Sequence, residues 1–193
     1  MDAENPDWNH LLREQWEFHW NQQLRPRLEG LTDDEYFWSP VPDAWNVRPR
    51  GTSSAPVQGG SGHFTIDFAH PEPDPAPFTT IAWRLGHVIV GVLAARNAAH
   101  FGAPAADYFT WDYAGDAATA RTQLQEQLDV WSEGLREVGT KGLLVPVGEA
   151  EPYPQAPMAE LVLHIHRELI HHLSEVALLR DLYRHMYRHT VKG

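Results

Sequence analysis

The chain contains no cysteine among its 193 residues. This absence excludes disulfide bonds, zinc sites built from thiolates, and any thiol nucleophile supplied by the protein itself. Basic residues are also few, because 15 Lys and Arg stand against 26 Asp and Glu and give a formal net charge of −11. Such a chain lacks the basic face that a nucleic-acid partner or an anionic membrane surface requires. We therefore expect neither partner.

Long hydrophobic runs are absent as well. The longest apolar run, around 85–95, is too short and too interrupted to span a bilayer. The first residues, MDAENPDWNH, do not show the charged segment followed by an apolar segment that marks a secretory signal. Both observations predict a cytoplasmic protein.

Tryptophan and histidine, by contrast, are plentiful. The chain has 8 Trp and 12 His, and six of the His lie between residues 164 and 189, so histidine chemistry is worth testing. Its length suits a single domain, 1–193, that can bury a sizeable core. With 42% hydrophobic and 21% charged residues, the composition is that of an ordinary globular protein.

Apolar residues recur at helical spacing in four segments of the chain. The predicted helices are 8–28, 79–101, 117–138 and 157–187. Residues 31–77 lose this spacing and are rich in Pro, Gly and Ser, with a short hairpin indicated near 59–70. Because no convincing run of strands accompanies the helices, we predict an all-α four-helix bundle with a long Pro/Gly-rich loop at 31–77.

The last predicted helix carries a carboxylate and an imidazole on the side that it has to bury. Its apolar stripe consists of Leu161, Ile165, Leu169, Val176, Leu179 and Tyr183. At about 100° per residue, His172 lies on this stripe, Glu168 about 40° to one side, and His171 about 100° away. A buried unpaired carboxylate costs several kcal/mol. Glu168 and His172 must therefore pair with each other or an Arg, line a water-filled cavity, or hold a divalent cation.

His87 is the third candidate ligand, in the middle of the second predicted helix. Small residues on its face, among them Gly91, leave space beside the imidazole. Taken alone, His87 is interpreted as a hydrogen-bonded core histidine. Glu168 and His172, taken as a pair, form either a salt bridge or a metal site. All three together favour a metal, because an open zinc site takes three protein ligands. Weaker candidates, near helix ends or beside the Trp stripe, are His10, His19 and His100.

Three motifs, in this order, are similar to those of the DinB-like superfamily of metalloenzymes: WSPVPDAWNVRPRG, PFTTIAWRLGHVIVG and RELIHHLSEVALLRDLY. The resemblance covers most of the chain and extends to the metal-binding domain of mycothiol-dependent maleylpyruvate isomerase. It implies a four-helix bundle holding a divalent metal, commonly zinc or nickel, through His87, Glu168 and His172. Many members carry His at the first of the two positions on the last helix. With Glu168 there, the chain resembles the His/Glu/His version, which leaves manganese and iron open too.

The resemblance also suggests roles for residues around such a site. Glu175, one turn past His172, is a candidate to support a metal ligand or to shuttle protons, or else a partly exposed carboxylate that pairs with a neighbouring helix. The 31–77 loop is the natural lid, in which Trp45 is a candidate apolar wall and Arg48 or Arg50 a candidate contact for an anionic substrate. The alternative is that Trp45 pins the loop and the arginines are solvated. Two further arginines remain: Arg84 is another candidate anion contact, and Arg180 is expected in an ion pair between helices.

The leading hypothesis is a divalent-metal-dependent enzyme that acts on a small molecule. The resemblance adds a low-molecular-weight thiol such as mycothiol as cosubstrate, and hence a thiol-dependent transferase or isomerase. A metal-dependent hydrolase fits the same ligands, and a metal-binding stress-response or structural protein without turnover is a second class. A third is a metal-free helical interaction module, because Leu163, Ile170 and Leu178 lie off the main apolar face and indicate deep burial or a homodimer contact.

Overall fold

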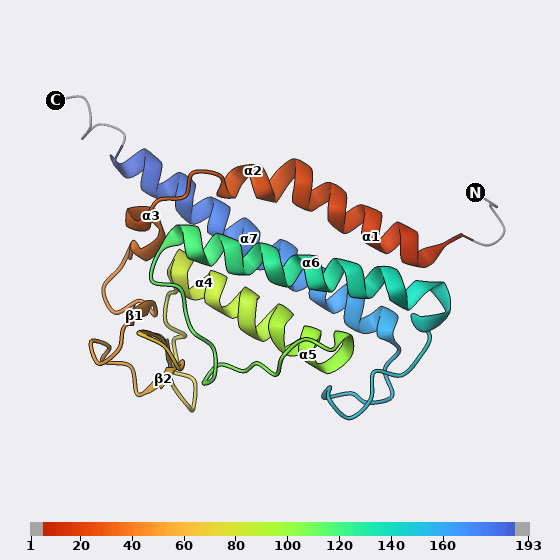
Figure 1. The fold of residues 1–193 in the computed structure, drawn as a ribbon. Coiled ribbons are helices and arrows are strands. Elements are labelled where there is room, and N and C mark those ends of the chain that lie inside the picture. Colours follow the sequence, from red (N-terminus) through yellow and green to blue (C-terminus); the bar gives the residue numbers. More distant parts are fainter. Residues whose placement is uncertain (1–5, 188–193) are drawn as a thin grey trace.

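A computed structural model of the chain describes residues 6–187 (Figure 1). Its helical body consists of four long helical runs. The first is α1 (Trp8–His19), η1 (Trp20–Leu24) and α2 (Arg25–Leu28); the second is α4 (Ile81–His87), η2 (Val88–Ala94) and α5 (Ala95–Phe101); the others are α6 (Ala117–Gly142) and α7 (Met158–Tyr187). Among the residues described, no helix has the length and apolar character needed to cross a membrane.

Side-chain caps define where the helices begin. Asp7 accepts a hydrogen bond from the backbone N–H of His10 at the start of α1, and Thr80 accepts one from Trp83 at the start of α4. The second run ends at Gly102, which has a left-handed φ of 69°. These are the residue types that terminate helices because they satisfy orphan backbone groups or tolerate positive φ.

The four runs pack side by side around one apolar core. Helix α6 contacts α1 on one side and η2 and α5 on the other, while α7 contacts α4, η2 and α1. The largest fully buried apolar side chains come from three of the runs and from the segment between the first two: Trp131, Tyr36, Ile66, Ile81, Leu85, Ile89, Leu93, Leu124, Leu135, Ile165 and Leu169. Burial of these side chains supplies most of the driving force for folding.

The all-α prediction is wrong, because residues 31–77 are not a plain loop. They contain a short helix, α3 (Asp33–Phe37), and a three-stranded antiparallel sheet of order β1-β3-β2. Its strands are β1 (Val47–Pro49), β2 (Val57–Gly59) and β3 (Phe64–Phe68). The predicted hairpin near 59–70 corresponds to β2 and β3, but β1 was missed. Strands of three to five residues between Pro and Gly are too short for an alternating pattern to stand out.

The sheet lies against the end of the helical body where α4 begins (Figure 1). Ile66 of β3 is fully buried, and a side chain at Gly86 of α4 would approach it to 2.9 Å. Gly86 therefore permits close contact between sheet and helix. The sheet is thus part of the support around α4 rather than a detached lid.

Two of the predicted helices are not continuous α-helix. In η1 and η2 the backbone hydrogen bonds shift to the wider π pattern, as in Arg25 N–H to Trp20 O and Ala95 N–H to Val90 O. Pro26 follows η1 and has no N–H to donate, which accounts for the irregularity there. The second π segment contains Gly91 and begins directly after His87, and π turns of this kind are frequent at functional sites.

A buried ion pair fastens α3 to α7. The Arg180 Nε donates to Glu35 Oε2 at 3.1 Å, and the two side chains are only 2% and 4% exposed. Arg184 adds a second contact to the same carboxylate at 2.7 Å. The expected ion pair of Arg180 is therefore present, with α3 as the partner helix.

The outer side of α7 carries exposed apolar residues. Leu163, Ile170 and Leu178 are all exposed, so deep burial does not explain them. The homodimer remains a prediction.

Candidate metal centre

Two aromatic side chains hold His87 at the junction of α4 and η2. Its ring stacks on Trp83 at 5.5 Å with an interplanar angle of 12°, while Tyr108 meets the ring edge, nearly coplanar at 10° and with centroids 6.3 Å apart. Its Nδ1 lies 2.7 Å from the Tyr108 hydroxyl oxygen. Burial lowers the pKa of His87 to about 4, and the nearby His172 adds to this shift. The imidazole is therefore neutral at pH 7 and has a lone pair available.

Helix α7 brings a second imidazole and two carboxylates to the same place. The rings of His87 and His172 are 4.8 Å apart and nearly perpendicular, at 85°. His172 Nδ1 lies 2.8 Å from Glu175 Oε2, whereas its Nε2 lies 3.5 Å from Glu168 Oε2. The short contact identifies Nδ1 as the donor to Glu175. Nε2 is then the nitrogen directed toward Glu168.

The helical projection predicted that His172 lies on the buried stripe of α7, with Glu168 close to it. In the structure these groups lie away from the centre of that stripe. Glu168, His172 and Glu175 are half-buried and lie along one edge of it, in line with His164. The centre of the stripe is shifted toward His166, which is buried. The sequence allowed three ways to accommodate Glu168 and His172: pairing, a cavity or a divalent cation. The structure shows Glu168 both in contact with charged or titratable neighbours and beside a cavity.

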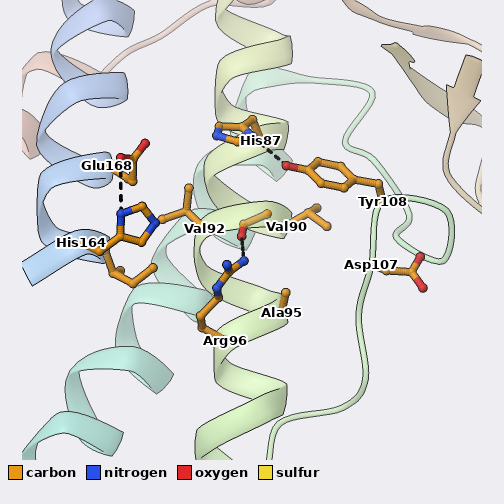
Figure 2. A pocket seen from close by; sticks show the side chains of 11 residues that line it. His87, Val90, Val92, Ala95, Arg96, Asp107, Tyr108, His164 and Glu168 are labelled. Atoms are coloured by element: carbon orange, nitrogen blue, oxygen red, sulfur yellow. Dashed lines mark hydrogen bonds and ion pairs between the residues drawn. The ribbon is translucent and has the colours of Figure 1, made fainter. Parts of the chain in front are cut away.

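A cavity of about 290 Å³ opens beside His87 and Glu168. Figure 2 shows the two residues on facing helices, with Tyr108 entering from the segment after α5 and with His164 and Arg96 below them. His164 Nδ1 is 3.7 Å from the Glu168 carboxylate. The cavity therefore combines an apolar wall from η2 with several polar groups, as small-molecule sites do.

An alternative set of donor atoms shares His172 with the first set, and it meets a spacing that His87, Glu168 and His172 do not. Among the residues described, His171, His172 and Glu175 bring one donor atom each within 4.8 Å of one another. In this set, Glu175 already forms an ion pair with Arg84, and the His171 side chain is 62% exposed. An arginine on the carboxylate competes with a cation. Glu168 of the first set also has an arginine, Arg167 at 3.4 Å, but that side chain is exposed and its contact is screened by water, whereas Arg84 is half-buried. The alternative set is therefore the less suitable of the two.

The predicted substrate residues lie in two places. Arg84 is close to the candidate centre, but its guanidinium is engaged by Glu175. Trp45 packs on Trp83 with ring centroids 5.9 Å apart, which connects it to His87 through one intervening ring.

Arg48 and Trp45 line a different hollow, which shares no residue with the cavity at His87. Arg48 Nε donates to Asp67 at 3.0 Å, and its NH2 group donates to the backbone oxygen of Ala44. Arg50 donates to the backbone oxygens of Gly60 and Gly62 in the β2–β3 turn. The structure therefore does not bring Arg48 or Arg50 to the candidate centre.

The weaker histidine candidates lie elsewhere. His10 is exposed, and the Nε2 of His19 is buried with no hydrogen-bond partner among the described residues. His100 Nε2 lies 3.1 Å from Glu151. None of them lines the cavity.

Sequence reasoning missed Tyr108 and Arg96, both of which line the cavity. Tyr108 comes from an irregular segment, where no periodicity shows which way a side chain points. Arg96 follows the π turn at η2, which shifts the helical phase that a projection assumes. The one available signal was Gly91, a small residue on the same helix as His87.

A family model described as the DinB superfamily matches residues 15–176 of the chain. No curated protein and no solved structure matches the chain.

Proposed function

The chain belongs to the DinB superfamily, and from this premise and the geometry around His87 we propose that it is a divalent-metal-dependent enzyme acting on a small molecule. His87, Glu168 and His172 are the proposed ligands. Their residue types suit zinc or nickel, and zinc sites with three protein ligands keep a position open for substrate.

The observation that carries the proposal is how the two imidazoles are oriented. Each has its Nδ1 engaged, by Tyr108 in one case and by Glu175 in the other. This leaves Nε2 as the coordinating nitrogen of both rings, the arrangement that metal-bound histidines adopt.

The spacing of one pair of the proposed donor atoms suits a shared ion. The 3.5 Å between His172 Nε2 and Glu168 Oε2 is long for a hydrogen bond. Two ligands at 2.0–2.1 Å from one tetrahedral ion lie about 3.3 Å apart, close to the observed value.

The chain's own residues complete the site. A divalent cation supplies Lewis acidity toward an oxygen or sulfur atom of the substrate. Glu175 accepts the Nδ1 proton of His172, and Arg84 holds the Glu175 carboxylate in place. We therefore assign Glu175 to positioning His172 rather than to carrying protons, and Arg84 to positioning Glu175 rather than to binding an anion.

The finer form of the proposal is a thiol-dependent transferase or isomerase with a cosubstrate such as mycothiol. The chain has no cysteine, so the sulfur would come entirely from the cosubstrate. The alternatives to a thiol-dependent enzyme are a metal-dependent hydrolase and a metal-stabilised protein without turnover.

Elemental analysis tests the ligand assignment. The protein is purified without a His-tag or nickel column, stripped with chelator and titrated with Zn²⁺ or Ni²⁺. We expect one ion per chain in the wild type and loss of binding in His87→Gln, Glu168→Gln and His172→Gln, each checked for its helical content. His171→Gln is the matched control, because it removes a neighbouring imidazole that only the alternative donor set uses.

Binding that survives Glu168→Gln but not His171→Gln would move the site to the alternative set, and a wild type that binds no ion would end the proposal. Turnover is then tested with the loaded protein on electrophiles with mycothiol or bacillithiol, and on simple esters. Metal-dependent loss of thiol supports the transferase, and ester cleavage supports the hydrolase. Large destabilisation by chelator with no turnover in any assay supports the structural role.

A further inference from the structure

We propose that Tyr108 is the positioning residue of His87, and that Gly91 is glycine because this contact needs the space; the inference rests on the metal site proposed above. Tyr108 enters the cavity from the segment between α5 and α6, far from the proposed ligands in sequence. Its hydroxyl oxygen lies 2.7 Å from His87 Nδ1 (Figure 2). Among the described residues this is its one hydrogen-bond partner.

Gly91 makes this approach possible. A Cβ atom added at Gly91 would lie 1.9 Å from the Tyr108 hydroxyl oxygen and 3.3 Å from His87 Nδ1. Any larger residue at this position would force the Tyr108 side chain away. The small residue on the face of His87 therefore makes room for the hydroxyl group and not only for a ligand.

The backbone of Tyr108 is clamped from two directions. Its carbonyl accepts a hydrogen bond of 3.1 Å from the Tyr113 hydroxyl, and it packs so closely on β2 that a Cβ at Gly59 would lie 2.4 Å from it. Its ring makes an edge contact with Phe68 of β3 at 4.9 Å. The small sheet thus supports the residue that meets His87.

The contact fixes which nitrogen of His87 faces α7. With Nδ1 bonded to Tyr108 and the ring stacked on Trp83, the imidazole cannot flip without losing the hydrogen bond or tilt without losing the stack. Nε2 is then the nitrogen presented to His172 and Glu168. A hydroxyl can donate or accept, so the metal would decide the tautomer: with a cation on Nε2, Nδ1 carries the proton and donates it to the Tyr108 oxygen. Loss of such a partner typically weakens metal affinity 10- to 100-fold.

The test compares two hydroxyl deletions, one in Tyr108 and one in Tyr36. Tyr108→Phe removes the contact to His87, whereas Tyr36→Phe removes a hydroxyl that bonds the Ala114 carbonyl at 3.2 Å. The Zn²⁺ dissociation constant is measured by competition with a chromogenic chelator, and the visible absorption spectrum is recorded with Co²⁺. We expect a roughly 10- to 100-fold higher dissociation constant and an altered Co²⁺ spectrum for Tyr108→Phe. Tyr36→Phe should stay within about twofold of the wild type because its hydroxyl is remote from the cavity.

Gly91→Ala provides a second route to the same contact, because both Tyr108 and His87 keep their side chains. It should weaken Zn²⁺ binding as Tyr108→Phe does, and it covers the case in which that variant does not fold. Equal affinity and an unchanged Co²⁺ spectrum in both variants, beside a wild type that binds one Zn²⁺, would overturn the positioning role alone. A wild type that binds no Zn²⁺ would instead overturn the metal site, and the inference with it.

Discussion

Acidification should destabilise the protein through His166, a buried histidine of α7 away from the proposed ligands. Its side chain is stacked on Trp16 at 5.7 Å, and its Nε2 accepts a hydrogen bond of 3.3 Å from the Trp131 indole. Burial lowers the pKa of His166 from 6.5 to about 4. Between these two values the unfolded chain binds a proton that the folded chain does not, so the free energy of unfolding decreases as the pH falls.

The size of the effect follows from the two pKa values. Between pH 7 and pH 5, the difference in proton binding at His166 removes about 2 kcal/mol from the free energy of unfolding. The effect is small above pH 7, because both states are then neutral, and it levels off below the folded pKa of about 4.

Urea unfolding of the metal-free protein at pH 7, 6 and 5 measures this contribution. His166→Gln keeps an acceptor for the Trp131 indole but cannot titrate, so it should lose about 2 kcal/mol less than the wild type over this range. His87, whose pKa is also lowered to about 4, is common to both proteins and cancels in the comparison. His10→Gln, at an exposed position, should follow the wild type. Equal decreases in the free energy of unfolding for the wild type and His166→Gln would refute the claim that His166 is neutral in the folded protein.

Two further predictions concern buried carboxylates. Glu35→Ala should lower the free energy of unfolding by about 3–5 kcal/mol in urea titrations, because it leaves Arg180 buried without its partner. Glu133→Ala breaks an exposed pair and should cost less than about 0.5 kcal/mol; equal losses would contradict the account. Asp67→Asn weakens the ion pair with Arg48 and should speed amide exchange in β1 and β3 about tenfold. Exchange in α6 should not change, and a uniform increase would show that the sheet is not a separate local unit.

Much of the helical part could be predicted from residue spacing. The segments at 8–28 and 79–101 have the expected bounds to within a few residues, and they begin at caps, Asp7 and Thr80, of residue types that favour helix starts. Helix α6 continues past the predicted end at Val138, through a break at Gly139. Spacing could not reveal η1 and η2, because a π turn adds one residue without changing composition.

The sheet shows a different limit of sequence reasoning. Its strands pair segments that are separated by Pro- and Gly-rich turns, and each strand is too short to establish a period of two. Its stability comes from contacts with α4, such as Ile66 against Gly86, which depend on residues distant in the sequence.

Helical spacing was enough to select His87, Glu168 and His172 as candidates. The structure brings the rings of His87 and His172 to 4.8 Å of each other and lines the cavity with His87 and Glu168, while their binding of a metal stays a prediction. The roles that depend on contacts between segments were not predictable. Tyr108 reaches His87 from an irregular segment, and Arg84 engages Glu175 from a different helix.

A crystal structure of the protein soaked in Zn²⁺, with anomalous diffraction at the zinc edge, tests the central claim most directly. The account predicts one anomalous peak bound by His87 Nε2, a Glu168 oxygen and His172 Nε2, at roughly 2.0–2.2 Å from each. A peak bound by His171 and Glu175 instead, or no peak at the cavity, would contradict it.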